Sequence, residues 1–150
     1  MMNQKSFGKH ITGIYRHLQI IINHDLNPYG LGSGQYVFLG TLAQHEGISQ
    51  KDLSQLIKID KTTTAKALKK LEKEGYIYRL QDQNDKRYNQ LYLTEKGKEF
   101  LPVMRKKLRN TTKILTKNMN EDQKDMAYDM LQLMMDNVTD AVSQIRDQDR

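Results

Sequence analysis

The sequence contains no cysteine. Disulfide bonds, zinc sites built on thiolates and thiol-based redox sensing are therefore excluded. The N-terminal segment lacks the apolar core of a secretory signal, and no apolar run approaches the roughly 18 residues of a membrane-spanning helix. These absences lead us to expect a soluble cytoplasmic protein that has no membrane partner.

Residue patterns typical of catalysis are also missing. The chain has no glycine-rich phosphate loop, no cysteine nucleophile and no closely spaced histidine and carboxylate set. His10, His17 and His24 recur every seven residues, which is about 10.5 Å along a helix and too far for neighbours to share one metal ion. We therefore predict no enzyme activity, no metal and no other cofactor, and interpret these histidines as exposed or interfacial.

Positive charge is concentrated in the middle of the chain. Residues 1–48 carry three basic and two acidic side chains, residues 49–110 carry sixteen and eight, and residues 111–150 carry five and eight. The three segment charges are thus +1, +8 and −3. Such asymmetry is typical of a nucleic-acid-binding segment, although a solvated lysine-rich surface would show the same excess.

The apolar content is low for a chain that must fill a core by itself. Hydrophobic residues make up 37% of the sequence, and the mean hydropathy is −0.77. Amphipathic helices in such a chain can bury their apolar stripes against another copy. We therefore expect an oligomer.

Hydrophobic spacing and capping residues predict a mostly α-helical chain with one small β-hairpin. Apolar residues three and four positions apart predict a helix over 7–26, which the proline and glycines of 28–34 end. Further helices are expected over 35–44, from Ser49, over 61–74, from Thr94 and from Asn120. Residues 76–80 and 88–93 are predicted to form two strands joined by a polar loop.

The same spacing predicts which side chains of three short helices face the core. For the helix over 35–44 these are Val37, Phe38 and Leu42; for the next, Leu53, Leu56 and Ile57; for the helix over 61–74, Ala65, Leu68 and Leu71.

The order of elements between Ser49 and Gly97 is that of a winged helix-turn-helix. The outward positions of the helix over 61–74 combine threonines near its start with lysines further along. Threonines can touch base edges or thymine methyl groups in a major groove, and lysines can meet phosphates. We predict that this helix reads DNA; an ordinary exposed lysine-rich helix is the structural alternative.

The loop of the predicted hairpin carries a second basic group. Asp85, Lys86 and Arg87 place two cations beside a carboxylate. An arginine held by a neighbouring acid suits a narrow minor groove, whose negative potential attracts guanidinium groups. A solvated β-turn is the alternative interpretation.

Residues 31–99 resemble the DNA-binding region of the MarR family of bacterial transcription regulators. The residues that carry the likeness run from Leu53 to Lys66, from Leu71 to Arg79, from Asp85 to Arg87 and from Leu93 to Gly97. Each of these motifs is weak alone, but their order and spacing are specific.

The resemblance implies a single MarR-like chain over residues 1–150. Residues 31–99 would form a winged helix-turn-helix, and helices within 6–28 and 100–146 would form the dimerisation region. It further implies a homodimer that binds a palindromic operator in double-stranded DNA, and a repressor that responds to a small aromatic or lipophilic effector. Tyr15 and Tyr36 could line an effector crevice, but packing in a core or interface is the favoured interpretation for both, so no effector site is assigned.

Site residues follow from the resemblance together with the pattern of the helices and hairpin. The expected DNA-binding residues are Ser49, Gln50, Lys61, Thr62, Thr63, Lys66, Lys69, Lys70, Asp85, Lys86 and Arg87. Arg87 would be the wing arginine paired with Asp85. Lys66 departs from the arginine that is frequent in the family, keeping the charge but losing the bidentate fork that suits guanine.

Two rivals to a sequence-specific regulator stay open at this point. One is a winged-helix adaptor that docks on proteins without specific DNA binding, and the other is a protein that packages DNA without sequence preference. Specific DNA binding that fades steeply between about 50 and 200 mM salt separates the regulator from both.

Overall fold

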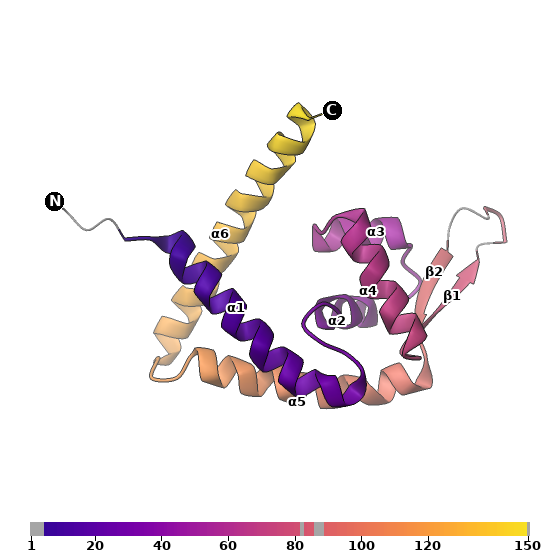
Figure 1. Cartoon of the computed structure of the whole chain (residues 1–150), viewed down its shortest axis with the longest axis horizontal. Helices are drawn as coiled ribbons and strands as arrows, with labels where there is room; N and C mark the ends of the chain where they lie inside the picture. The colour runs from indigo at the N-terminus through magenta and orange to yellow at the C-terminus, as the bar shows by residue number, and fades with distance from the viewer. Residues whose placement is uncertain (1–4, 82, 86–88, 150) are drawn as a thin grey trace. The chain divides into compact units, whose positions relative to one another are not determined.

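A computed structural model describes residues 5–81, 83–85 and 89–149 of the chain. Within these residues it contains six α-helices, one short 3-10 helix and a two-stranded antiparallel sheet, which confirms the expected mostly helical fold with a hairpin. In chain order the elements are α1 (Phe7–Leu26), η1 (Asn27–Tyr29), α2 (Tyr36–Gln44), α3 (Gln50–Ile57), α4 (Lys61–Lys73), β1 (Ile77–Gln81), β2 (Asn89–Leu93), α5 (Glu95–Leu115) and α6 (Glu121–Gln148) (Figure 1).

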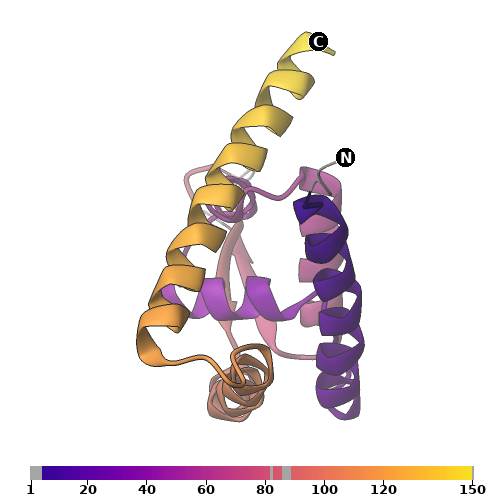
Figure 2. The ribbon, with the colours of Figure 1, turned by 90° about the vertical axis from the view of Figure 1, so that its left-hand side faces the viewer.

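The described residues form two compact units, one ending at Thr111 and the other starting at Thr112. The first unit holds α1 to β2 and most of α5, and its core joins α2 to α5 and to the hairpin. Figures 1 and 2 show α2 between α3 and α5 in this unit. The helix-turn-helix is therefore built on a continuous core rather than appended to it.

Side-chain caps fix where the helices begin. The Ser49 hydroxyl accepts from the backbone N–H of Asp52 at 3.1 Å, and an Asp60 carboxylate oxygen accepts from Thr63 N–H at 2.9 Å. These bonds satisfy amide groups that have no partner within the helix. They confirm the starts of α3 and α4 that local sequence alone predicts.

A tight turn sets α4 against α3. Lys58 adopts a left-handed backbone conformation with φ of 62° and ends α3. Two bonds then close the turn: Ile59 N–H donates to Ser54 O at 3.2 Å, and the Ser54 hydroxyl donates to Ile59 O at 2.6 Å. Because the turn uses both the backbone carbonyl and the side-chain hydroxyl of Ser54, the direction of α4 is fixed by hydrogen bonds as well as by packing.

The hairpin pairs β1 with β2 in antiparallel register, with Ile77 opposite Leu93 and Arg79 opposite Leu91. The segment before α3 extends this sheet, because Gly47 N–H donates to Leu91 O at 2.8 Å and Leu91 N–H donates to Ile48 O at 3.0 Å. The hairpin is thereby attached to the start of α3.

Apolar side chains from the helices and the hairpin of the first unit form one core. Its fully buried members include Leu26, Leu39, Leu42, Leu53, Leu68, Leu71 and Leu91. The glycine at position 97 is required here, because a Cβ atom would collide with the carbonyl of Tyr76. The start of α5 thus packs directly on the backbone that leads into β1.

Three of the predicted core positions are wrong. Val37 and Leu56 are 37% and 49% exposed, and Ala65 is only half-buried. In α3 the buried neighbour of Leu53 is Ser54, whose hydroxyl closes the turn, so Leu56 points to solvent.

In α4 the inward face is Thr64, Ala67, Leu68 and Leu71. The Thr64 hydroxyl donates to the carbonyl of Asp60 at 2.8 Å, so burying it leaves no polar group unsatisfied. A buried threonine rotates the apolar stripe away from the position that spacing alone suggests, and Ala65 falls at its edge.

The second unit consists of the end of α5 and of α6. A capping box begins α6, in which Asn120 and Gln123 each accept a hydrogen bond from the other's backbone, as predicted. No side chain of α6 is buried, and Leu131, Val138 and Ile145 are 61%, 56% and 57% exposed.

In the part of the chain that the structure describes, no helix has the length and hydropathy needed to span a bilayer.

Candidate nucleic-acid interface

The outward face of α4 carries the predicted reading residues. Thr64, Ala67, Leu68 and Leu71 are buried, and since successive residues turn by about 100°, the positions on the opposite side of the helix face solvent. The exposed side chains of α4 are Lys61, Thr62, Thr63, Lys66, Lys69, Lys70, Glu72 and Lys73. The structure therefore brings together on one exposed helix all six of the candidates that lie between 61 and 70.

The composition of this face changes along the helix. Thr62 and Thr63 lie in the first turn, which the Asp60 cap holds in helical geometry. Further along, Lys66, Lys69, Lys70 and Lys73 line a shallow surface depression together with Glu74. Short hydroxyl side chains therefore precede a cluster of cations.

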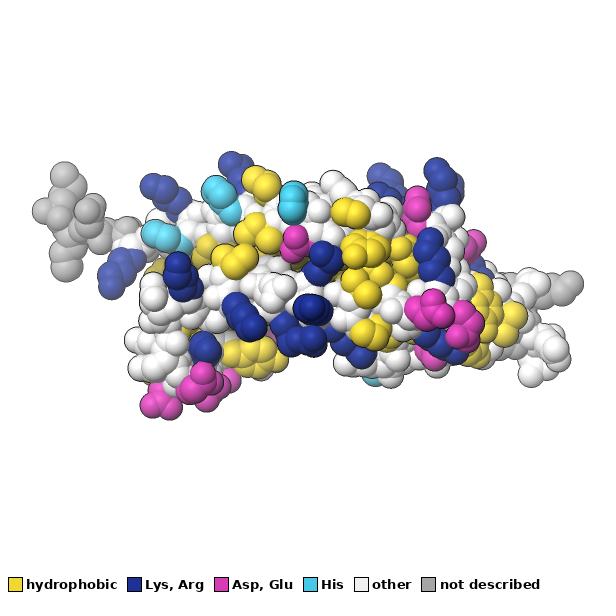
Figure 3. All heavy atoms as spheres, turned by 90° about the horizontal axis from the view of Figure 1, so that it is seen from below, with side chains coloured by type: hydrophobic (Ala, Val, Ile, Leu, Met, Phe, Trp, Pro, Cys, Tyr) yellow, Lys and Arg dark blue, Asp and Glu magenta, His cyan; other side chains and the backbone are white. Residues whose placement is uncertain are grey.

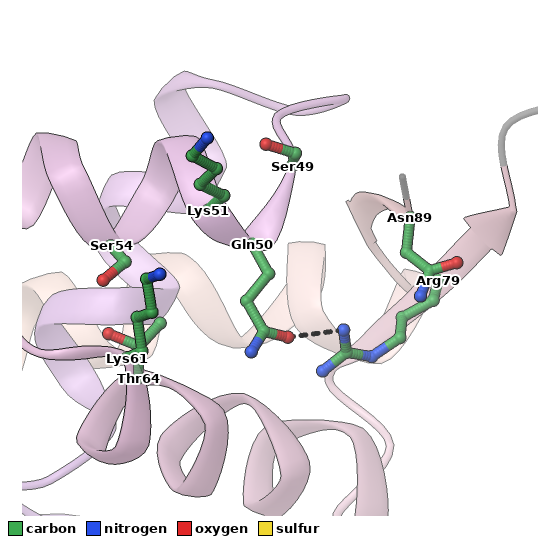
Figure 4. Close-up of a pocket in the computed structure, with 8 residues that line it drawn as sticks. All are labelled: Ser49, Gln50, Lys51, Ser54, Lys61, Thr64, Arg79 and Asn89. Carbon is green, nitrogen blue, oxygen red and sulfur yellow. Dashed lines mark hydrogen bonds between the residues drawn. The ribbon is translucent and has the colours of Figure 1, made fainter. Parts of the chain in front are cut away.

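A pocket of about 460 Å³ lies beside α4, open to solvent and shared by α3, α4 and the hairpin (Figure 4). It is lined by Ser49, Gln50, Lys51, Ser54, Lys61, Thr64, Arg79 and Asn89. Three predicted site residues, Ser49, Gln50 and Lys61, thus share one concave surface. Helix α3 begins there, and the N-terminal N–H groups of a helix favour anions.

Arg79 connects the elements around this pocket. Its Nε donates to Oε2 of Glu72 on α4 at 2.7 Å, and its Nη1 donates to Oε1 of Gln50 on α3 at 2.7 Å. The Arg79 side chain is 25% exposed and that of Glu72 is 45% exposed. The pocket therefore combines cations from all three elements, of which Arg79 is already paired with an acid.

Lys51, Arg79 and Asn89 line the pocket but were not predicted as site residues. A signal for Arg79 is present in the sequence, because it alternates with Ile77 and so lies on the core face of an amphipathic strand. A charged residue at such a position requires a partner. The identity of the partners follows only from the packing of α3 and α4.

The remaining candidates lie between the strands. Asp85 is half-buried, while Lys86 and Arg87 lie outside the described residues. The pairing of Arg87 with Asp85 stays a prediction.

The tyrosines considered for an effector crevice have different surroundings. Tyr36 packs partly buried against the core, and burial, together with the nearby Tyr15, raises the pKa of its hydroxyl. Tyr15 is 59% exposed, and its hydroxyl accepts from Nε2 of Gln19 at 2.8 Å. Their role in binding an effector stays open.

Positive charge is not confined to α4. Figure 3 shows Lys and Arg side chains interleaved with hydrophobic ones on the face seen from below. Exposed Arg105, Lys106 and Arg109 of α5 also contribute cations to the first unit. Charge alone therefore does not locate the site, and the evidence for it is the arrangement of α3, α4 and the hairpin.

Among the described residues, no three histidine or acidic side chains are grouped in a way that could hold a metal ion.

Comparisons with known proteins agree with this arrangement. A family model described as MarR family matches residues 31–88. The HTH-type transcriptional regulator YybA of Bacillus subtilis (strain 168) is 33% identical over 130 residues, which are 87% of this chain and 87% of YybA.

Solved structures give the same result over most of the chain. A MarR transcriptional regulator from Methanosarcina mazei Go1 is 41% identical, with a TM-score of 0.81 over 89% of this chain and 96% of its own. A MarR family transcriptional regulator from Listeria monocytogenes, crystallised with 26mer DNA, is 31% identical, with a TM-score of 0.84 over 92% of each chain.

Proposed function

The chain belongs to the MarR family of transcriptional regulators, and we propose that it binds double-stranded DNA as a homodimer at a palindromic operator. The observation that carries the proposal is the division of α4 into a buried face and an exposed face that bears Thr62, Thr63 and Lys66. As a member of a family of regulators, the chain is a regulator rather than an enzyme.

The exposed face of α4 suits a major groove. The groove is about 12 Å wide and admits one helix, so Thr62 and Thr63 in the first turn can reach base edges. Lys66 contacts a guanine or a phosphate, and Lys69 and Lys70 contact phosphates on the flank of the groove. The crystallisation of the Listeria relative with 26mer DNA supports DNA binding by this chain.

The pocket beside α4 receives the DNA backbone. Ser49 and Gln50 lie at the start of α3, and Lys61 lies opposite them at the start of α4. Hydroxyl, amide and ammonium donors in one concave surface are the donor types that bind phosphate oxygens. The loop that contains Asp85, Lys86 and Arg87 reaches the flanking minor groove.

Dimerisation uses the helices within 6–28 and 100–146, outside the winged helix-turn-helix at 31–99. Phe7, Ile14 and Tyr15 of α1 are 63%, 52% and 59% exposed, and the apolar side chains of α6 are exposed to a similar degree. Apolar side chains at helical spacing gain about 25 cal/mol for each Å² that a second copy removes from water. A two-fold dimer then presents two copies of α4 to half-sites about 34–36 Å apart.

The regulator acts in the cytoplasm as a repressor whose release is triggered by a small aromatic or lipophilic effector. A modest rotation of one winged module relative to the other mismatches both half-sites, so a ligand needs to shift the dimer only slightly to release DNA.

A selection for bound sequences from a random duplex library, followed by binding titrations, tests the proposal. We expect a palindromic site, with affinity that falls by roughly a thousandfold or more between 50 and 200 mM salt. Binding to DNA without a preferred sequence would indicate packaging, and absence of DNA binding would favour the adaptor hypothesis.

A further inference from the structure

We propose that Arg79 is a positioning residue that fixes the hairpin and the Gln50 amide in the geometry that DNA binding requires. The proposal rests on the proposed function and adds a role for an arginine that does not itself need to touch DNA. Its basis is the pair of hydrogen bonds that join β1 to α4 and to α3; Figure 4 draws the one to Gln50 of α3.

The guanidinium group of Arg79 joins three elements that face the DNA. Nε bonds to Glu72 in the last turn of α4, and Nη1 bonds to Gln50 in the first turn of α3. Both bonds are 2.7 Å long, and the arginine side chain is only 25% exposed. A planar guanidinium has fixed donor directions, so holding two partners at once restricts the angle between the hairpin and both helices.

The bond to Gln50 also fixes the orientation of its amide. Arginine has donors only, so the Gln50 oxygen must face it and the NH₂ group must point the other way. Figure 4 shows the Gln50 nitrogen directed away from Arg79. The amide is thereby oriented as a hydrogen-bond donor for a phosphate oxygen at the start of α3.

Charge is not the contribution of Arg79. Glu72 neutralises it at 2.7 Å, so the pair presents little net charge to the DNA. Lys51 and Lys61, which line the same pocket, are the cations available to attract phosphates. A positioning role for Arg79 and a purely electrostatic role therefore predict opposite changes in DNA affinity when the Glu72 charge is removed.

The test is the variant Glu72→Gln, assayed on the selected operator. Removing a negative charge from a DNA-facing surface strengthens binding if only charge matters. If Arg79 acts as a positioning residue, the variant instead binds about tenfold more weakly, because charge-assisted bonds are lost in both subunits of the dimer. Arg79→Lys keeps the positive charge but loses the fork, and it is expected to weaken binding to a similar extent.

A hydroxyl-radical footprint separates positioning from a general loss of fold. We expect Glu72→Gln to lose protection at the operator flanks that the hairpin contacts, while protection of the central grooves is retained. Glu99→Gln removes the same charge from an exposed position of α5 and is the matched control, expected to bind like wild type. Thermal unfolding of each variant establishes the folded fraction.

Equal or tighter binding by Glu72→Gln would overturn the inference, as would a weakening that is uniform across the footprint and matches a loss of folded protein. If the wild type itself selects no sequence, the proposed function fails and the role of Arg79 fails with it.

Discussion

Replacement of Lys66 by alanine tests whether α4 meets the DNA backbone. The Lys66 side chain is exposed on α4 and is not part of the core, whereas the side chain of Leu68, two positions later, is fully buried. Alanine is a strong helix former, so the variant keeps α4 intact. Any loss of DNA affinity then reports a lost contact rather than a lost fold.

The size of the effect follows from counterion release. Each lysine that neutralises a phosphate contributes about 0.9 to the slope of log K against log salt, so a dimer that loses two lysines loses about 1.8. From 50 to 200 mM, log salt changes by about 0.6. The drop in affinity over that interval is therefore about tenfold smaller for Lys66→Ala than for the wild type.

Fluorescence anisotropy with a labelled operator at four or more salt concentrations provides the measurement. Lys5→Ala is the matched control, because Lys5 is an exposed lysine that precedes α1 and lies outside both the proposed DNA interface and the proposed dimerisation helices. Its slope is expected to equal that of the wild type. An unchanged slope for Lys66→Ala would refute the assignment of this lysine to a phosphate.

Three further predictions concern the elements that hold the site. Leu68→Ala is expected to lower the free energy of unfolding by about 2–5 kcal/mol because the Leu68 side chain is fully buried. The Leu56 side chain is 49% exposed, so Leu56→Ala is expected to lower the free energy of unfolding by well under half as much. Equal losses in urea titrations would contradict the placement of these two leucines. Asp60→Ala removes the cap bond to Thr63 N–H and is expected to cost about 1 kcal/mol, with Asp60→Asn largely retaining stability; a larger loss for the asparagine variant would argue against capping. Burial raises the pKa of Tyr76, and Glu74 and Tyr29 raise it further, so the folded state favours the neutral hydroxyl that donates to Tyr29 O at 2.6 Å. This contribution to stability is complete below the unfolded pKa of about 10 and is lost as pH rises through the folded pKa, so Tyr76→Phe is expected to show a smaller alkaline loss of unfolding free energy than the wild type; parallel pH profiles would contradict the shift.

Features encoded by local sequence could be predicted well. The bounds of α1, the caps at Ser49 and Asp60, and the capping box of Asn120 depend on residues only a few positions apart. The outward direction of Thr62, Thr63 and Lys66 also followed, because the opposite face carries Leu68 and Leu71. Short-range hydrogen bonds and helical periodicity determine such features almost independently of the rest of the fold.

Features that depend on tertiary contacts could not be predicted. Thr64 can be buried because its hydroxyl donates to the carbonyl of the capping residue Asp60, and Leu56 is exposed because Ser54 takes the inward position for the turn. Arg79 joins Glu72 and Gln50, seven and twenty-nine residues away in the chain, and only the folded arrangement brings these groups together. Hydrophobic spacing treats threonine and serine as outward residues and so misses these two placements, and the alternation that places Arg79 on the core face of its strand does not identify its partners.

Methylation interference on the selected operator tests most directly whether α4 reads the major groove. Methyl groups at guanine N7 project into that groove, where the first turn of α4, with Thr62 and Thr63, is proposed to lie. We predict that they block binding in two clusters about 10–10.5 base pairs apart, centre to centre, related by the symmetry of the palindrome. Binding that tolerates every N7 methyl group, while remaining sensitive to blocked phosphates, would contradict major-groove reading by α4.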